Sequence, residues 1–346
     1  MDVRLSAEQQ ALRDSAAELV QKLGPHSVLD LDDAERAAKL DAAIESVGWR
    51  ELRTADEDGN ALASAVETAL IAAELARGLA DAAFLGPTLA AELRRLAGAP
   101  PATSPETVAL TPGLTQLAVV PDEDTACGSL AIDALGSSSA LVLISGPAGY
   151  DLATVPVTAA TAPVDLTRPV SDLAGARAVR VQPQPYPLST GQLRQWTTFA
   201  VALACADLVG TMAGAIQLTA GYAKLRQQFG QPIGAFQAVQ HTLADSFVAA
   251  EGSRSIAMHA AWAAESLPPS EADVAARAAK AYCSRAARTV CEAAVQVHGG
   301  IGNTWECAAH LYLRRALLTA ELLGGPGESV QHVLAHHLNG ASEHGL

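Results

Sequence analysis

The stretch of the sequence best suited to chemistry is LRQQFGQPIGAFQAVQH, which runs from Leu225 to His241. It places Arg226 at the end of a long helical pattern, and Phe229 with Gly230 then turns the chain before a second helix begins. A guanidinium group beside backbone donors and a flat aromatic ring can anchor the pyrophosphate and the ring of a nucleotide. An ordinary helix hairpin with a solvated arginine has the same spacing, so the pattern alone leaves both interpretations open.

A second stretch, AVQVHGGIGNTWECAA from Ala294 to Ala309, combines a glutamine with a Gly-Gly turn. Together the two stretches resemble the signatures of the acyl-CoA dehydrogenase family, flavoenzymes that desaturate acyl-CoA thioesters at the α,β bond. The segments LSAEQQALRDSAAELV and AAELARGLADAAFLG resemble that family's N-terminal domain. The likeness is strong after residue 190 and weak between about 100 and 187.

The resemblance implies an FAD site that is shared between subunits. In the family, the Arg-x-x-Phe-Gly turn reaches across a subunit interface to the ADP half of the neighbour's FAD, and the glutamine and glycines face the same nucleotide. A residue without Cβ lets the backbone approach a phosphate or ribose closely. The matching positions, and hence the predicted cofactor-binding residues, are Arg226, Gln228, Phe229, Gln237, Gln296, Gly299 and Gly300.

The catalytic carboxylate of the family is missing from the matching positions. The reaction needs a base that removes the substrate α-proton while the β-hydride passes to the flavin. Alignment by counting puts Leu323 at one family position for this base and Val201 near the other. No Asp or Glu lies between residues 172 and 207, and Asp207 itself faces another side of the helix. We therefore predict no catalytic residue in this chain, with Glu321 as the alternative, a base displaced by two residues.

The middle of the chain also departs from the family. Members with their own flavin-ring site carry a Thr-Glu-Pro-x-x-Gly-Ser-Asp-like turn and a Trp-Ile-Thr-like strand there. Residues 105–187 contain neither motif and no tryptophan. We infer that the chain's own flavin-ring and acyl pockets are degenerate, whereas its nucleotide-facing surface is kept.

The elements that must position these residues follow from hydrophobic periodicity. Helical patterns fill Leu5 to Leu96, where Ser6 and Gln9 predict a capping box, and a Gly-Ala-Pro-Pro stop follows. Gly/Pro/Ser clusters then separate short apolar runs, which predicts a small antiparallel β domain. These runs are Thr107–Leu110, Leu117–Val120, Ala140–Ile144 and Ala178–Val181.

Long helical patterns return after the β segment. They predict an up-and-down bundle of four helices near residues 190–228, Phe236–Ser266, Glu271–His298 and Thr304–Leu323. Ser189 with Gln192, and Ser270 with Asp273, are the expected helix caps. The predicted fold is mainly α with a small β domain, acyl-CoA dehydrogenase-like. Its domains are an N-terminal helical domain (1–104), a reduced β domain (105–187) and a C-terminal bundle (188–346).

Composition excludes several classes of function. The 346 residues carry a net charge of −14, which argues against nucleic acid and against an anionic membrane surface. Phe199 to Ile216 is apolar enough to be weighed as a membrane span, but Asp207 at its middle favours a buried helix. Five cysteines without a Cys-x-x-Cys pair favour a reducing cytoplasm, and acidic residues stand where a signal peptide would be apolar.

Three histidines near the C-terminus and His298 give weaker signals. His332, His336 and His337 have helical spacing, which suits a packing or solvated helix better than a metal site, so no metal is predicted. His298 has two open interpretations, a donor to a phosphate or a ring packed against Trp305.

The asymmetric loss of motifs predicts a particular kind of enzyme subunit. The chain resembles the small, non-catalytic subunit of the α2β2 acyl-CoA dehydrogenases of bacterial steroid side-chain degradation. This implies a homologous catalytic partner that supplies the base, the flavin-ring contacts and most of the acyl-CoA site, with electron-transfer flavoprotein as acceptor and an isolated chain that is inactive. The alternatives are a self-sufficient homo-oligomeric dehydrogenase that uses Glu321 and a flavin-free scaffold subunit.

Overall fold

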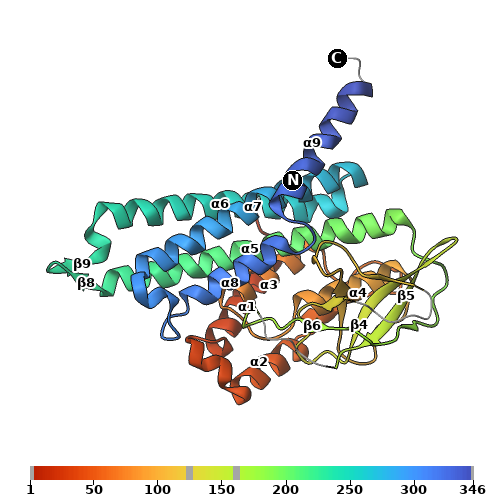
Figure 1. Ribbon diagram of the computed structural model, residues 1–346, viewed down its shortest axis with the longest axis horizontal. Coiled ribbons are helices and arrows are strands. Elements are labelled where there is room, and N and C mark those ends of the chain that lie inside the picture. The colour runs from red at the N-terminus through yellow and green to blue at the C-terminus, as the bar shows by residue number, and fades with distance from the viewer. Residues whose placement is uncertain (1–3, 122–127, 159–163, 344–346) are drawn as a thin grey trace.

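A computed structural model describes residues 4–121, 128–158 and 164–343 of the chain. Figure 1 shows an elongated molecule in which long helices lie along one side and the sheet lies at one end of the other side. The helices are α1 Ala7–Leu23, α2 Ala34–Ser46, α3 Ala65–Arg77, α4 Leu85–Leu96, α5 Thr190–Leu225, α6 Gln237–Ser266, α7 Pro269–His298, α8 Ala309–Glu321 and α9 Pro326–Glu343. The strands are β1 Glu106–Leu110, β2 Val119–Val120, β3 Leu130–Ala131, β4 Ser139–Gly146, β5 Gly149–Pro156, β6 Ser171–Asp172, β7 Val179–Arg180, β8 Gln227–Gln228 and β9 Gln231–Pro232. Short 3-10 helices lie at η1 Val28–Asp32, η2 Trp49–Glu51, η3 Ile233–Ala235 and η4 Gly299–Asn303.

The helix starts follow the local capping chemistry that the sequence predicts at two places. Ser6 and Gln9 form a reciprocal capping box before α1, and Ser189 with Gln192 forms another before α5. The cap predicted from Ser270 and Asp273 is wrong. α7 begins earlier, at Pro269, because proline fixes φ near the helical value and lacks the N–H that a first turn leaves unbonded.

The sheet is mixed, which corrects the antiparallel prediction. Its path is β6-β3-β1-β4-β5-β7, with β2 beside β4. β1 and β2 both run parallel to β4, whereas the remaining pairs in this sheet are antiparallel. Alternate side chains of β4 enter two different hydrophobic clusters: Leu141 and Leu143 join the large one, and Val142 and Ile144 join the small one. Burial on both faces explains why this strand is a continuous apolar run.

The C-terminal bundle contains more than the four predicted helices. α5 has 36 residues and ends at Leu225, three residues earlier than expected, because residues 227–228 pair with 231–232 in a small hairpin. α9 follows α8 and leaves the body of the molecule, with the C-terminus at its far end (Figure 1). The large hydrophobic cluster joins the N-terminal helices, one side of the sheet and the bundle into one core.

The apolar helix that resembled a membrane span is the centre of this core. Among the described residues, Thr190–Leu225 is the helix long and apolar enough to cross a bilayer, and 89% of its most apolar window is buried inside the protein. The α5 helix packs against α3, α6, α7 and α8. Intramolecular packing therefore accounts for its hydrophobicity.

Candidate cofactor site and the vacant base position

The turn that carries Arg226 is a tight, exposed hairpin at one end of the bundle (Figure 1). Arg226 ends α5 in an extended conformation, and its carbonyl accepts the Ile233 amide at 2.8 Å, which closes the β8–β9 loop. Phe229 takes a left-handed conformation (φ 52°), which is strained for a residue with a side chain, and Gly230 follows it at φ 78°. Phe229 is 92% exposed. Within this chain its ring contacts Phe236 edge to face, with ring centroids 6.2 Å apart.

The side chains predicted to hold a nucleotide point away from the chain's own core at this end. Arg226 and Gln228 are exposed, and Gln237 is exposed at the first position of α6. Phe229 contacts Phe236 with one edge, but most of its ring faces solvent beside the exposed Arg226 side chain. The arrangement is suited to a surface that is completed by another molecule.

The second predicted motif lies at the end of α7. Gln296 is exposed in the last turn, and Gly299 ends the helix with φ 68°, a value that favours glycine. A Cβ added at Gly299 or Gly300 would meet no atom of this chain within 4 Å. Backbone at Gly299 and Gly300 is thus open to the outside, which fits the close approach of a phosphate or ribose.

A ring stack joins the two motifs. Tyr222, one turn before Arg226, stacks on His298 with ring centroids 4.4 Å apart, so the ends of α5 and α7 are in contact. His298 is 6% exposed, and its Nδ1 lies 2.7 Å from the Ala294 carbonyl. The packing interpretation of His298 therefore holds, but its ring partner is Tyr222. Trp305 instead meets the edge of His310.

His298 also contacts a thiol. Burial lowers the pKa of His298, but its hydrogen bonds with Cys307 and the Ala294 carbonyl outweigh burial and raise that pKa overall. Burial raises the pKa of Cys307, but the His298 ring lowers it overall. This pairing fixes the turn between α7 and α8 behind the exposed glycines.

Leu323, which counting along the sequence places at the family's base position, faces a cavity. Leu323 helps to line a cavity of about 370 Å³ between the sheet, the start of α5, α7 and α9. Its amide donates to the Leu114 carbonyl at 2.7 Å, and its carbonyl accepts from Arg277 at 2.7 Å, so the turn is fixed. Glu321, the alternative base, is exposed at the end of α8 and does not line this cavity. Val201 is fully buried in α5.

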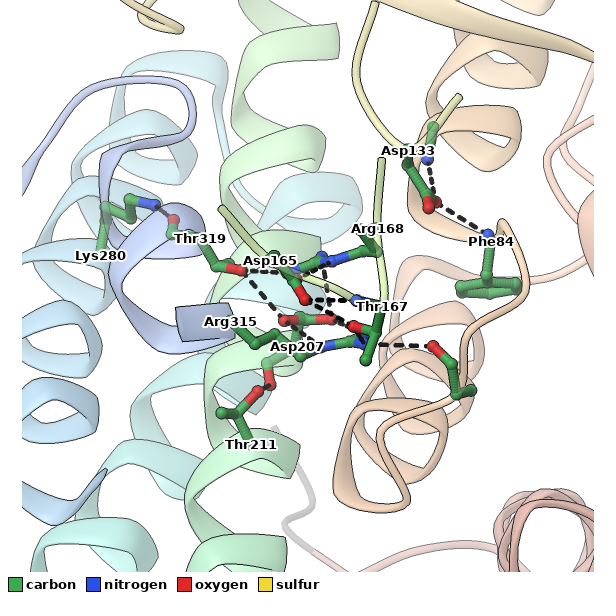
Figure 2. A network of polar contacts seen from close by, with 12 residues as sticks. Phe84, Asp133, Asp165, Thr167, Arg168, Asp207, Thr211, Lys280, Arg315 and Thr319 are labelled. Carbon is green, nitrogen blue, oxygen red and sulfur yellow. Dashed lines mark hydrogen bonds and ion pairs between the residues drawn. The ribbon is translucent and has the colours of Figure 1, made fainter. Parts of the chain in front are cut away.

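Asp207 belongs to a buried network that the sequence analysis did not find (Figure 2). Its carboxylate accepts from Arg315 of α8 at 2.7 Å and from Arg168 at 3.2 Å. Asp165 also accepts from Arg168, and Thr319 of α8 bonds to Asp207 and Arg168. Burial raises the pKa of Asp207, but the two arginines outweigh it and hold that pKa below its ordinary value. The network holds α5, α8 and the segment after β5 together. None of its residues described above lines the cavity beside Leu323.

The histidines near the C-terminus contact an aspartate or each other. His332 Nε2 lies 2.7 Å from an Asp273 carboxylate oxygen on α7, which explains why Asp273 is not a helix cap. His336 meets His337 edge to face. Among the described residues, no group of three or more potential metal ligands lies close together.

The fold and these surfaces define a class of protein. N-terminal helices, a small sheet, a bundle built on a 36-residue helix and an exposed Arg-x-x-Phe-Gly hairpin together form an acyl-CoA dehydrogenase architecture. Residues 197–338 match the C-terminal domain of acyl-CoA dehydrogenases.

Relatives that match almost the whole chain identify its family. The acyl-CoA dehydrogenase IpdE2 of Mycobacterium tuberculosis is 32% identical over 94% of this chain and 96% of its own length. IpdE2 of Mycolicibacterium smegmatis is 29% identical over 96% of this chain and 99% of its own. The chain therefore belongs to the acyl-CoA dehydrogenase family.

Solved structures agree on the fold. A chain of the Tcur3481-Tcur3483 steroid acyl-CoA dehydrogenase (ACAD) superposes with a TM-score of 0.79 at 22% identity, over 97% of this chain and 99% of that one. A chain of the ChsE4-ChsE5 complex from M. tuberculosis gives 0.74 at 22% identity, over 98% and 99%. Butyryl-CoA dehydrogenase from Megasphaera elsdenii gives 0.75 at 19% identity, over 98% and 100%.

Proposed function

We propose that this chain is the non-catalytic subunit of a hetero-oligomeric, α2β2 acyl-CoA dehydrogenase, in which it completes the FAD site of a homologous catalytic partner. The observation that carries the proposal is an asymmetry within one chain. The hairpin and the glycine turn suited to a neighbour's nucleotide are exposed and intact, whereas the base position holds Leu323. A leucine cannot accept a proton, so the base must come from elsewhere.

The length of α5 supports a flavin that is shared between two chains. Thr197 lines the cavity near the start of this helix, and Arg226 ends it, 29 residues later. At 1.5 Å per residue the two are about 44 Å apart. A flavin whose pyrophosphate contacts Arg226 therefore does not place its ring in this chain's own cavity, which leaves a partner's pocket as its location.

The residues at the tip fit the ADP half of FAD. Arg226 would form charge-assisted hydrogen bonds to pyrophosphate oxygens, Phe229 would cover an apolar part of the nucleotide, and the Gly299–Gly300 backbone would approach it closely. Gln228, Gln237 and Gln296 are exposed amides that can bond to ribose or adenine. When bound, FAD supplies the hydride acceptor of the reaction. This chain's contribution is to bind and orient the nucleotide end of the cofactor.

Relatives suggest the substrate class and the assembly. One structural neighbour is described as a steroid ACAD with two named components, and another as the ChsE4-ChsE5 complex. By analogy, we propose α,β-desaturation of a steroid-derived acyl-CoA thioester, bound mainly by the partner, in the cytoplasm, with electron-transfer flavoprotein as the electron acceptor.

Co-expression tests the proposal directly. The chain is to be purified alone and together with a candidate catalytic acyl-CoA dehydrogenase homologue from the same genome, and the flavin content and desaturation rate are to be compared. We expect bound FAD and activity only in the co-purified complex, at one flavin per pair of unlike chains. An isolated chain that is yellow and bleaches with acyl-CoA would support the self-sufficient enzyme with Glu321. A stable complex whose flavin content does not respond to Arg226→Ala would support a scaffold.

A further inference from the structure

The stack of Tyr222 on His298 lies where the two nucleotide-facing motifs leave the packed body of the protein. Tyr222 is half-buried in α5, whereas residues 224–228, which follow it, are all exposed. His298 is buried in α7, whereas residues 299–300 are exposed. The two rings are 24° from parallel, with centroids 4.4 Å apart. They therefore meet at the level at which α5 and α7 pass from the core into the exposed motifs.

The tyrosine is connected to the hairpin through the backbone. Its carbonyl accepts the Arg226 amide at 2.8 Å, and the Arg226 carbonyl accepts the Ile233 amide at the same distance. The first of these bonds ends α5, and the second closes the hairpin. A displacement of the Tyr222 ring therefore moves the backbone that carries the Arg226 guanidinium.

The histidine is connected to the glycine turn in a similar way. Its Nδ1 lies 2.7 Å from the Ala294 carbonyl oxygen. Because a carbonyl oxygen only accepts, Nδ1 is the protonated nitrogen, and this bond orients the ring. Gly299, the next residue, turns the chain with φ 68°, and its amide still bonds to carbonyls of the last helical turn. The His298 ring is thus fixed relative to the glycine backbone.

We propose that Tyr222 and His298 are positioning residues for the shared FAD. Their stack sets the spacing between the Arg226 guanidinium and the Gly299–Gly300 backbone, so that both groups reach one nucleotide. This inference rests on the proposed function. An aromatic pair stabilises one arrangement of the two helix ends, and an arrangement that is fixed before binding lowers the entropic cost of binding. Loss of the stack should therefore weaken FAD binding without displacing the flavin ring, which the partner holds.

The first measurement is the dissociation constant of FAD from the co-purified complex. Tyr222→Leu removes one ring and should weaken binding about twofold to tenfold, whereas Tyr222→Phe keeps the ring and should restore the affinity. His298→Leu should weaken binding to the same degree. The double variant should bind FAD no more weakly than either single variant, because both substitutions remove the same contact. At saturating FAD, the desaturation rate of Tyr222→Leu should return to that of wild type.

The second measurement needs no partner. Hydrogen exchange on the isolated full-length chain, followed by mass spectrometry, reports on the hairpin and on the glycine turn separately. Tyr222→Leu should speed exchange at residues 299–304, and His298→Leu should speed exchange at residues 226–233, although each substitution lies on the other helix. Tyr282→Leu, at an exposed tyrosine of α7 about 24 Å along the helix from His298, is the matched control and should change neither segment.

The outcomes distinguish this inference from the proposed function. Unchanged exchange in both single variants, additive losses of FAD affinity in the double variant, or a Tyr222→Phe complex as weak as Tyr222→Leu would overturn the positioning role. FAD affinity that Arg226→Ala reduces but Tyr222→Leu does not would also overturn it, and the proposed function would stand. A complex that binds FAD as tightly as wild type with either substitution would overturn both.

Discussion

Asp207 of α5 accepts a hydrogen bond from Arg315 of α8 at 2.7 Å, and both side chains are almost completely buried. The same carboxylate accepts from Arg168, so one aspartate compensates two guanidinium groups at the junction of α5, α8 and the segment after β5. A charge in this position is tolerated only with all its partners present.

Replacing Asp207 should therefore destabilise the chain strongly. We expect Asp207→Asn to lower the free energy of unfolding by about 3–5 kcal/mol, because buried Arg315 loses its carboxylate partner and Arg168 keeps only Asp165. Urea denaturation followed by circular dichroism measures the change. Arg288→Gln breaks an exposed pair with Glu292 and, as the matched control, should leave the free energy of unfolding nearly unchanged. Equal effects of the two substitutions would show that the network does not stabilise the junction of α5, α8 and the segment after β5.

The buried Lys280 predicts an unusual dependence of stability on pH. Burial lowers the pKa of this ammonium to about 8, whereas the same group in the unfolded chain titrates near 10.5. Between these values the unfolded chain binds one more proton, so the free energy of unfolding should rise with pH, by about 3 kcal/mol at most. Below pH 8 both states are protonated and this contribution is constant.

The Lys280→Met substitution isolates the contribution of this ammonium group to the pH dependence of stability. The variant loses the bond to the Thr319 carbonyl, which shifts its stability at every pH, but it also loses the titrating group. In urea denaturation measured from pH 7 to 10, the midpoint of the wild type should therefore rise relative to that of the variant above pH 8. Parallel curves over that range would mean that the Lys280 ammonium titrates at its ordinary value.

Arg226 should control cofactor affinity in the assembled enzyme. A charged hydrogen bond contributes about 1.5–3 kcal/mol, so Arg226→Ala should weaken FAD binding about tenfold to a hundredfold. Arg226→Lys should recover only part, because lysine lacks the planar fork. Added FAD should restore activity, since in the proposed complex the catalytic base is on the other chain. The dissociation constant of FAD from the co-purified complex is the measurement, and an unchanged value in the alanine variant would remove Arg226 from the site.

The glycine turn allows a test that does not disturb folding. Gly300 has no left-handed φ, and a Cβ there meets nothing in this chain, so Gly300→Ala should leave stability within about 0.5 kcal/mol. If a nucleotide lies against this backbone, the added methyl group should nevertheless reduce flavin content. Gly327→Ala, at an equally open position on α9, is the control. A fully loaded Gly300→Ala complex would argue against close approach at this turn.

A substitution at Glu321 distinguishes the proposed function from the alternative, a self-sufficient dehydrogenase that uses Glu321 as its base. Glu321 is exposed and does not line the cavity, so Glu321→Gln should leave the desaturation rate of the complex within about twofold of wild type. Removal of a general base would instead reduce the rate by a factor of about 10²–10⁴. Single-turnover bleaching of the flavin by acyl-CoA distinguishes the two outcomes.

The sequence predicted what depends on neighbours along the chain. Two capping boxes, the long apolar helix and the turn after Arg226 follow from residues that are three or four positions apart. The partners of Asp207 do not, because Arg168 is 39 residues before it and Arg315 is 108 residues after it. A lone carboxylate in an 18-residue apolar run does indicate a buried counter-ion, but no local pattern identifies which arginine provides it. Parallel pairing of β1 with β4 is missed for the same reason, since strand direction is set by a connection of 28 residues.

The exposed hairpin has a consequence for how a cell must make this protein. Leu225 and Phe229 are 82% and 92% exposed. An exposed apolar tip of this kind favours aggregation and recognition by chaperones and proteases. Molecules synthesised in excess of their partner would carry it uncovered for their whole lifetime. If the proposed partner covers this hairpin, the cell must produce the two chains at the same time and in equal amounts, and translation from one messenger RNA would achieve this.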